Sequence, residues 1–367
     1  MSKQTPLHAA HQRAGASFTD FAGYDMPVRY ESDLVEHHAV REAAGMFDLS
    51  HMAEISVVGA GAGDFLDYAL SNKLSVLENH QAKYSLLLSP EGGVVDDLIV
   101  YRLAEDRYLI VANAANRDAA VTALSERTIG FDVTVRDESD DWALIAVQGP
   151  HSRVILEEAG IEIAESLDEL RYYRITTGTF NTEQVLIART GYTGEDGYEV
   201  YVADTHAQAL WDELEATGAG HGMRLCGLAC RDTLRLEAGM PLYGHELSLE
   251  WTPQQAGLGK VVVAKESFVG MPALEPSATD ARVLVGLVAE GKRAARAGYV
   301  VRSPEGDTIG EVTSGALSPT LGYPIAMAYV DPQYAELDTD LVVDVRGSDV
   351  GVRVQPLPFY QRKKAAS

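Results

Sequence analysis

The chain has 367 residues, 46% hydrophobic and 23% charged, which is typical of a globular protein with two or three domains. Its 54 acidic and 30 basic residues give a formal net charge of −24, which argues against nucleic acid or an anionic membrane as a partner. No apolar run approaches the roughly 18 residues of a membrane span. The two cysteines form no disulfide framework and the start is too polar for a signal peptide, so we expect a reducing cytoplasm.

The basic residues are mostly arginine, because only eight lysines occur in the whole chain. An acidic chain poor in lysine is typical of a salt-adapted protein, whose carboxylates hold water and cations. An acidic enzyme from a GC-rich genome would have the same composition, so both interpretations stay open.

Two stretches of alternating strands and helices precede a region of short strands. The first has the order β-α-β-β-β-α-β, close to a split βαβ, ferredoxin-like unit. Its strands are expected at 54–58, 84–88, 98–103, 108–112 and 131–135, and its helices at 62–70 and at 116–129, the latter capped by Asn116. After a polar break at 137–141, strands are expected at 142–147, 184–188 and 198–202, and helices at 151–158 and 207–216. Residues 283–355, rich in Val and Gly, predict a small β-barrel or sandwich.

Two patterns resemble known ligand- or metal-binding sites, but a structural role explains each of them better. The glycines at 59, 61 and 63 lack the further glycine at 64 that a dinucleotide-binding turn needs, so they predict a tight turn. Cys226 and Cys230 share a helix face without further ligands nearby, so we expect both to be buried. No histidine spacing matches a metal site, and we predict no metal.

Several segments carry side chains suited to chemistry. Asp96 and Asp97 enter a strand built for burial and point to opposite faces, although alternation alone does not say which of them faces a site. A turn acid at the mouth of the strand is the other interpretation of this pair. The loop 189–199 combines glycines with Tyr192 and Glu199, which suits a flat ligand with an amino edge, or an ordinary hairpin. Arg231 opens a half-buried helix, where it needs a partner: a ligand, or Asp232 or Glu237 on the same helix. A small-residue loop spans 310–321.

These segments together resemble the T-protein (aminomethyltransferase) family of the glycine cleavage system. The resemblance runs from Thr5 to Tyr360 and includes 45–52, the Asp-Asp strand, the Gly-Tyr-Thr-Gly-Glu-Asp-Gly-Tyr-Glu loop, 229–239 and 252–259. Small departures are Cys230, where the family often has alanine, and Gln254-Gln255 in place of an acidic pair.

The resemblance implies an α+β fold of three domains in a cloverleaf, with two related α+β lobes and a C-terminal β-barrel. The expected domains are 1–50 with 138–275, an inserted lobe at 51–137, and the barrel at 276–367. The implied reaction transfers the methylene carbon of aminomethyl-dihydrolipoyl H-protein to tetrahydrofolate, releasing ammonia and giving 5,10-methylenetetrahydrofolate. No metal and no flavin are expected.

The resemblance also implies the roles of individual residues. Asp97 corresponds to the catalytic aspartate. Residues expected to line the folate site are Tyr84, Asn113, Tyr192, Glu199, Arg231 and, with a less secure match, Arg362. Two alternatives share the fold: a folate-dependent demethylase, which would be expected to carry a flavin domain, and a folate-binding accessory protein without transfer activity, which would be expected to lack part of this residue set.

Overall fold

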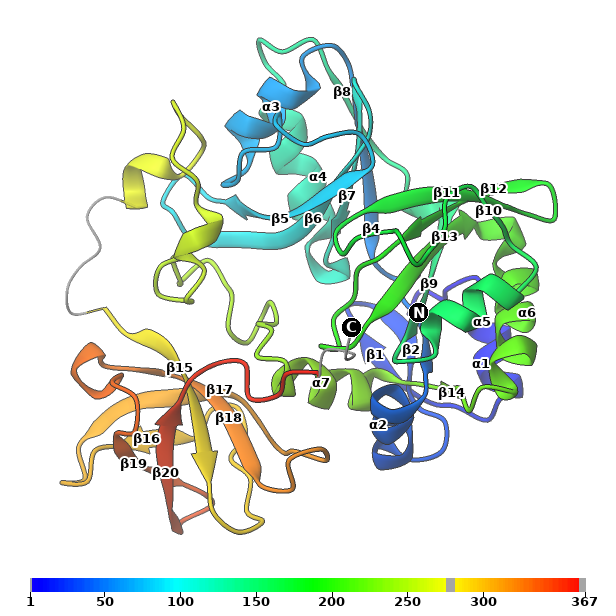
Figure 1. Cartoon of the computed structure of the whole chain (residues 1–367). Coiled ribbons are helices and arrows are strands. Elements are labelled where there is room, and N and C mark those ends of the chain that lie inside the picture. Colours follow the sequence, from blue (N-terminus) through cyan, green and yellow to red (C-terminus); the bar gives the residue numbers. More distant parts are fainter. Residues whose placement is uncertain (1, 275–280, 363–367) are drawn as a thin grey trace. The chain divides into compact units, whose positions relative to one another are not determined.

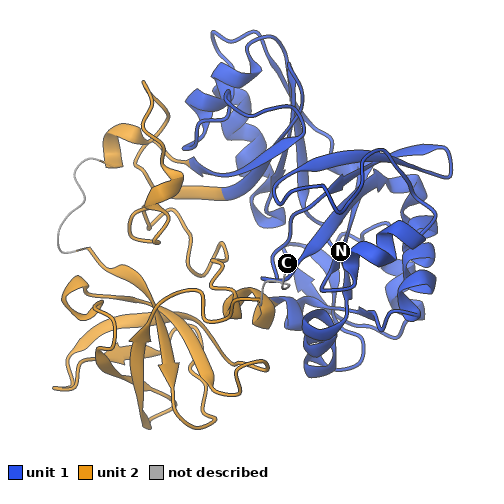
Figure 2. Ribbon diagram, viewed as in Figure 1, with its two compact units in different colours: residues 1–87, 97–231 blue, residues 88–96, 232–367 orange. Residues whose placement is uncertain are grey.

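The computed structural model describes residues 2–274 and 281–362. By the density of internal contacts, the chain divides into two compact units, which Figure 2 shows in blue and orange. Unit 1 comprises Met1–Leu87 and Asp97–Arg231, and unit 2 comprises Leu88–Asp96 and Asp232–Ser367.

Unit 1 contains an antiparallel sheet in the order β5-β6-β7-β4-β8, with helices inserted along the chain (Figure 1). Its elements are β4 (Ala53–Val58), α3 (Ala62–Ala69), β5 (Gln81–Leu88), β6 (Val94–Ala104), β7 (Arg107–Ala112), η1 (Ala114–Asn116), α4 (Arg117–Glu126) and β8 (Thr134–Asp137). The chain order is that of the predicted ferredoxin-like series. The ends of β5 and β6 nearest their connecting turn are counted with unit 2.

The boundaries differ from the prediction around α4. The helix ends at Glu126 instead of residue 129, because turns follow it and Gly130 has a φ of 91°. The next strand consequently begins at Thr134, three residues later than predicted. Asn116 does precede the helix, but its side chain makes no capping hydrogen bond.

The second sheet of unit 1 has the order β10-β11-β12-β13-β9-β3-β14, antiparallel except for the pairing of β14 with β3. Its strands are β3 (Gly45–Asp48), β9 (Trp142–Gln148), β10 (Glu162–Ile163), β11 (Ile175–Phe180), β12 (Glu183–Ala188), β13 (Gly197–Ala203) and β14 (Arg224–Leu225). Associated elements are α1 (His8–Arg13), the hairpin β1 (Ser17–Phe21) and β2 (Tyr24–Arg29), α2 (Asp33–Glu42), η2 (Ser139–Asp141), α5 (Ser152–Glu158), η3 (Asp204–His206) and α6 (Ala207–Ala219).

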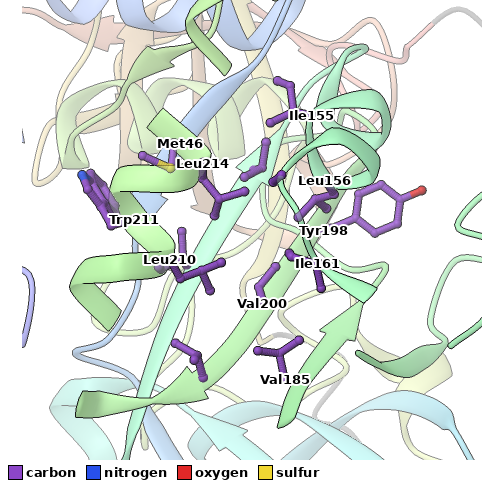
Figure 3. Close-up of a cluster of buried hydrophobic side chains, with 14 of the residues drawn as sticks. Met46, Ile155, Leu156, Ile161, Val185, Tyr198, Val200, Leu210, Trp211 and Leu214 are labelled. Carbon is purple, nitrogen blue, oxygen red and sulfur yellow. The ribbon is translucent and has the colours of Figure 1, made fainter. Parts of the chain in front are cut away.

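Helices α5 and α6 pack against this sheet through a buried apolar cluster (Figure 3). Leu156 of α5, Trp211 of α6 and Val200 of β13 belong to this cluster, and all three side chains are almost fully buried. Burying a side chain of this size contributes about 1.5–3 kcal/mol. The cluster therefore gives the strand that carries Glu199 a rigid support.

Unit 2 contains a closed barrel in the order β15-β18-β17-β16-β19-β20, which Figure 1 colours from yellow to red. Its strands are β15 (Val283–Ala289), β16 (Val300–Arg302), β17 (Thr308–Leu317), β18 (Pro324–Val330), β19 (Asp340–Asp344) and β20 (Asp349–Gln355). The remaining elements are η4 (Gly259–Val261), η5 (Met271–Leu274), η6 (Pro332–Tyr334) and α7 (Leu228–Glu237), which crosses from unit 1 into unit 2. The barrel confirms the first of the two β architectures predicted for 283–355.

Candidate active site

Asp97 is held by two side chains from neighbouring strands of its sheet. The hydroxyl of Tyr84, on β5, donates to Asp97 Oδ2 at 3.0 Å. Asn113, at the end of β7, donates through Nδ2 to Asp97 Oδ1 at 2.9 Å and to the Asp97 carbonyl oxygen at 3.0 Å. Because β5 and β7 flank β6, the sheet itself brings these three predicted residues together.

Strand alternation separates Asp97 from its neighbour. Along β6, Val94, Asp96 and Leu98 are buried, whereas Val95 and Asp97 keep partial exposure. The two carboxylates therefore lie on opposite faces, and Asp97 is the one that a ligand can reach.

Burial raises the pKa of Asp97 to about 6, and the hydrogen bonds from Tyr84 and Asn113 limit the rise. Burial of the Tyr84 phenol, together with the neighbouring Asp97 carboxylate, holds its pKa well above the usual range. At neutral pH the site thus contains a mostly ionised carboxylate and a neutral phenol, with the phenol fixed as a donor.

We expect the charge on Asp97 to destabilise the fold at neutral pH. The pKa in the folded protein, about 6, exceeds the reference value of 3.8, so ionisation of Asp97 lowers the free energy of unfolding above pH 6. This destabilisation decreases as pH falls through the folded pKa. Asp97→Asn should therefore be more stable than the wild type by about 1–3 kcal/mol at pH 8. Urea unfolding of both proteins at pH 8 and pH 5 measures this, and the difference should shrink by about half at pH 5. A variant less stable than the wild type at pH 8 would contradict the raised pKa.

A second group surrounds Glu199 on β13. The side chain is only 8% exposed, and its Oε2 accepts a hydrogen bond from Thr190 Oγ1 at 2.5 Å. Burial raises the pKa of Glu199, and Thr190 and the Arg231 guanidinium act in the opposite direction. Thr190 Oγ1 also lies 3.0 Å from the hydroxyl of Tyr101, which is on the same strand as Asp97. This chain of contacts joins the two sheets of unit 1 beside the predicted site.

Arg231, at the start of α7, lies over the ring of Tyr192, with its guanidinium carbon 4.8 Å from the ring centre. Neither an ion pair nor a side-chain hydrogen bond joins it to residues 2–274 or 281–362, so the alternative partners Asp232 and Glu237 are not used. Burial lowers the pKa of Arg231, opposed by Tyr192 and Glu199. A half-buried guanidinium with most donors unused, beside a buried carboxylate, can bind a polar ligand.

The loop that carries Tyr192 is held at both ends. Arg189 forms a bidentate pair with Asp196, at 2.9 and 2.5 Å, and Arg41 donates to the Glu195 carboxylate at 2.9 Å. A Cβ at Gly191 or Gly197 would lie 2.0 or 2.4 Å from the Gln148 side chain, so close packing explains these two glycines. The glycine-rich loop is therefore a fixed support for the aromatic ring.

Tyr173 and His51 also lie near the site, and neither of them was identified as a site residue from the sequence. Burial raises the pKa of the Tyr173 phenol, and among the further causes are the charges of Glu199 and Asp97, which places Tyr173 near both carboxylates. Its φ of 63°, rare for tyrosine, is invisible in the sequence. Burial lowers the pKa of His51 to about 4, and the charge of Asp48 opposes this shift while that of Arg231 reinforces it. His51 Nδ1 is buried and lacks a hydrogen-bond partner within the part of the chain described.

Unit 1 thus brings together all but one of the predicted site residues. Tyr84, Asp97 and Asn113 form one group, and Tyr192, Glu199 and Arg231 form the other. Arg362 is exposed and belongs to unit 2.

Among the described residues, no cluster of His, Cys, Asp and Glu suits a metal ion, and no helix is long and apolar enough to cross a membrane. Cys226 and Cys230 are both buried, as predicted.

Comparison with known proteins identifies the family. The "GCVT N-terminal domain" matches residues 7–266, and the "Glycine cleavage T-protein C-terminal barrel domain" matches residues 282–361. The chain belongs to the glycine cleavage T-protein family. Among similar T-proteins, the aminomethyltransferase of Cutibacterium acnes is 56% identical, covering 98% of this chain and 99% of its own length. The Streptomyces coelicolor aminomethyltransferase is 53% identical, covering 99% and 98%.

A solved T-protein structure agrees with the fold. The aminomethyltransferase T of Bartonella henselae superimposes with a TM-score of 0.91 at 37% identity, covering 98% of this chain and 99% of that one. The predicted α+β fold with a C-terminal barrel is confirmed. The chain is accordingly an enzyme, an aminomethyltransferase of the glycine cleavage system, and the demethylase and accessory-protein alternatives are not favoured.

Proposed function

We propose that this T-protein transfers a methylene carbon from the aminomethyl-dihydrolipoyl arm of H-protein to tetrahydrofolate. In the balanced reaction, the C–S and C–N bonds of the aminomethyl group break and the carbon forms bonds to two folate nitrogens. The two protons lost by those nitrogens leave on the lipoyl thiol and on ammonia. The observation that carries the proposal is the Asp97 carboxylate, fixed by Tyr84 and Asn113 on the more exposed face of β6.

Asp97 is proposed as the catalytic residue because the transferred carbon becomes cationic when ammonia leaves. A carboxylate already oriented by two donors stabilises that charge without reorganising at the moment of reaction. Its raised pKa of about 6 also suits proton transfer near neutral pH. Glu199 and Arg231 are proposed to hold the amino-pyrimidine end of the folate, with the Tyr192 ring as an apolar face. Arg362 is proposed as an additional folate contact.

The direct test supplies purified protein with tetrahydrofolate and H-protein loaded with the aminomethyl group. Ammonia and 5,10-methylenetetrahydrofolate should appear in equal amounts, and neither should form with unloaded H-protein or without folate. Activity with dimethylglycine or sarcosine as the donor, in place of loaded H-protein, would instead make the chain a demethylase. Folate binding without any transfer would make it an accessory protein.

Arg231→Ala is expected to weaken folate binding by about tenfold to a hundredfold, because a hydrogen bond to a charged group is lost inside the site. Isothermal titration with tetrahydrofolate measures the dissociation constant. Arg224→Ala is the matched control, since Arg224 is an exposed arginine just before α7. An unchanged dissociation constant in folded Arg231→Ala would make Arg231 a structural residue.

This proposal also includes a cytoplasmic location and three domains, which are 1–50 with 138–275, 51–137 and 276–367.

Adaptation to salt is a further part of the proposal, and the net charge of −24 supports it. Unscreened repulsion should destabilise such a chain at low ionic strength, so its melting temperature should rise between low and molar potassium chloride. A flat or falling profile would contradict salt adaptation and leave the enzymatic proposal unaffected.

A further inference from the structure

Glu54, on β4, has a buried carboxyl group that none of the described residues binds. The residue is 1% exposed, and neither of its side-chain oxygens makes a hydrogen bond within residues 2–274 and 281–362. Its backbone is satisfied, since its amide donates to Ser139 Oγ at 3.0 Å and its carbonyl accepts from the Glu138 amide at 2.9 Å. A buried polar group left unsatisfied costs free energy, so the Glu54 side chain calls for an explanation other than stability.

The cation that acts on Glu54 is already paired with other carboxylates. Arg117, at the start of α4, forms ion pairs with Asp137 and Asp140, at 2.7 Å each. Burial raises the pKa of Glu54 well above its usual range, opposed by Arg117 and reinforced by the two aspartates. At neutral pH, Glu54 is therefore a neutral carboxylic acid with one O–H group to donate.

Strand register places Glu54 on the face of the sheet that carries Asp97. Glu54 pairs with Val111 on β7, and Val111 pairs with Ile99 on β6. Residues directly opposite each other in a ladder share a face, and Asp97 and Tyr101 lie two residues to either side of Ile99. Glu54 and Tyr101 therefore share the face that carries the proposed catalytic residue.

Hydroxyl groups on this face form a chain that ends at Glu199 and has a fixed direction. Thr190 Oγ1 donates to Glu199 Oε2 at 2.5 Å, which uses its only proton. The Tyr101 hydroxyl, 3.0 Å from Thr190 Oγ1, must therefore donate to it, and the Tyr201 hydroxyl donates to Tyr101 at 3.4 Å. All three protons thus point along the chain towards Glu199. In the described part of the protein, no donor reaches the Tyr201 oxygen at the far end.

Glu54 and Tyr201 are complementary in what they lack. Burial raises the pKa of the Tyr201 phenol, and the charge of Glu54 is among the further causes, which places the two groups near each other. Glu54 has a proton to donate and no acceptor among the described residues, whereas the Tyr201 oxygen has room to accept and no donor.

We propose that Glu54 is a positioning residue for folate binding, which donates to Tyr201, directly or through one water, and so orients the hydroxyl chain towards Glu199. This rests on the proposed function, in which the Glu199 carboxylate binds the amino-pyrimidine end of the folate. Donation along the whole chain keeps Glu199 ionised and fixed as an acceptor. An ionised Glu54 would instead accept the Tyr201 proton, break the first link of the chain and repel Glu199.

Substitutions of Glu54 that keep the length of the side chain test this role. Glu54→Met removes the donor, so tetrahydrofolate should bind about threefold to tenfold more weakly in isothermal titration, which is the effect of one hydrogen bond. Glu54→Gln still donates through its amide and should restore the affinity of the wild type. Ser56→Ala is the matched control, because Ser56 lies on the same face of β4 and binds Glu138 outside the chain. An unchanged dissociation constant in Glu54→Met would overturn the proposal.

Stability separates positioning from a structural role. Glu54→Met replaces an unsatisfied polar group by an apolar one, so its urea midpoint should equal or exceed that of the wild type. A loss of affinity that comes with a loss of stability would make Glu54 a structural residue and overturn its positioning role.

Tyr201→Phe tests whether Glu54 acts through the hydroxyl chain. It removes the link next to Glu54, so the double variant Glu54→Met/Tyr201→Phe should bind tetrahydrofolate no more weakly than the weaker of the two single variants. Losses that multiply in the double variant would show two independent effects and would contradict the chain.

The pH dependence of folate affinity isolates the charge of Glu54. Its pKa is raised, so it ionises as pH increases, and the wild-type dissociation constant should rise from about pH 7 to about pH 9.5. The dissociation constant of Glu54→Gln should rise less, because an amide cannot ionise. The other groups that act on the two carboxyls are the same in both proteins: Arg117, Asp137, Asp140, Tyr173, Arg231 and the tyrosines of the chain. Identical pH profiles would overturn the proposal.

Infrared difference spectra between the wild type and Glu54→Gln give a measurement that does not need folate. At pH 7 the wild type should show the carbonyl stretch of an un-ionised carboxylic acid, and the variant should lack it. Absence of this band in the wild type would overturn the proposal whatever the folate result. A wild-type chain that shows the band and binds no tetrahydrofolate would instead overturn the proposed function.

Discussion

Asp97→Asn should slow transfer by roughly 10²–10⁴-fold while leaving folate binding largely intact, the usual scale for a positioned acid–base group. The substitution keeps the size of the side chain and the partners Tyr84 and Asn113, and it removes the negative charge that we propose stabilises the cationic carbon. Single-turnover formation of 5,10-methylenetetrahydrofolate from preloaded H-protein measures the rate, and folate affinity is measured separately. The variant should also be the more stable protein at pH 8, so misfolding cannot explain the loss.

Asp96→Asn is the natural comparison, because it makes the same chemical change one residue away. Asp96 is fully buried on the opposite face of β6, so its substitution should affect stability more than transfer. Rates are compared per folded molecule, determined by circular dichroism. Equal losses in the two variants, or a larger loss for Asp96→Asn, would overturn the assignment of Asp97. A loss confined to folate affinity would make Asp97 a binding residue.

The order of the elements could be predicted because hydrophobic periodicity is a local signal. Strand β4 was expected at 54–58 and lies at Ala53–Val58, and α5 was expected at 151–158 and lies at Ser152–Glu158. The region around α4 was predicted less well. Whether a helix stops at Glu126 depends on turns stabilised by tertiary packing, and β8 takes its register from β4.

The site was predicted residue by residue only through family resemblance. Alternation established that Asp96 and Asp97 point apart, but which face is buried is a property of the assembled sheet. Tyr173 was missed because its placement depends on a left-handed backbone and on two strands from different sheets. Contacts such as Tyr101 with Thr190 join residues 89 positions apart, and no local pattern encodes them.

On helix α7, the arginine with a buried structural partner is Arg235 and not Arg231. A buried arginine needs a partner, and Asp232 and Glu237 were the local candidates for Arg231. Asp232 instead pairs with Arg235, whose Nε lies 2.9 Å from its Oδ1. Glu237 accepts hydrogen bonds from the Ser318 and Thr320 hydroxyls, at 2.5 and 2.7 Å. The residue that required a buried structural partner was Arg235, and its main partner, Glu246, lies outside the helix.

Arg235→Met should destabilise the protein by about 3–5 kcal/mol, because it leaves the buried Glu246 carboxylate without its cationic partner. Arg235 is 1% exposed and Glu246 is fully buried, and they form an ion pair at 3.0 Å. The remaining donors to Glu246, which include Thr313 and the Leu242 amide, are neutral and do not balance its buried charge. Urea unfolding should show a lower midpoint, and Trp251, stacked on Tyr329 in unit 2, gives a near-ultraviolet signal for this region.

The double variant Arg235→Met/Glu246→Leu decides the cause of the loss. If the penalty comes from an unpaired charge, removing both partners should recover most of the free energy of unfolding, because a buried pair is often replaced by apolar side chains at little cost. If it comes from lost packing around Arg235, the double variant should be no more stable than Arg235→Met. Folate affinity at Arg231 should be unchanged in either case, since the two arginines have separate partners: Arg231 the ring of Tyr192, Arg235 the Glu246 carboxylate.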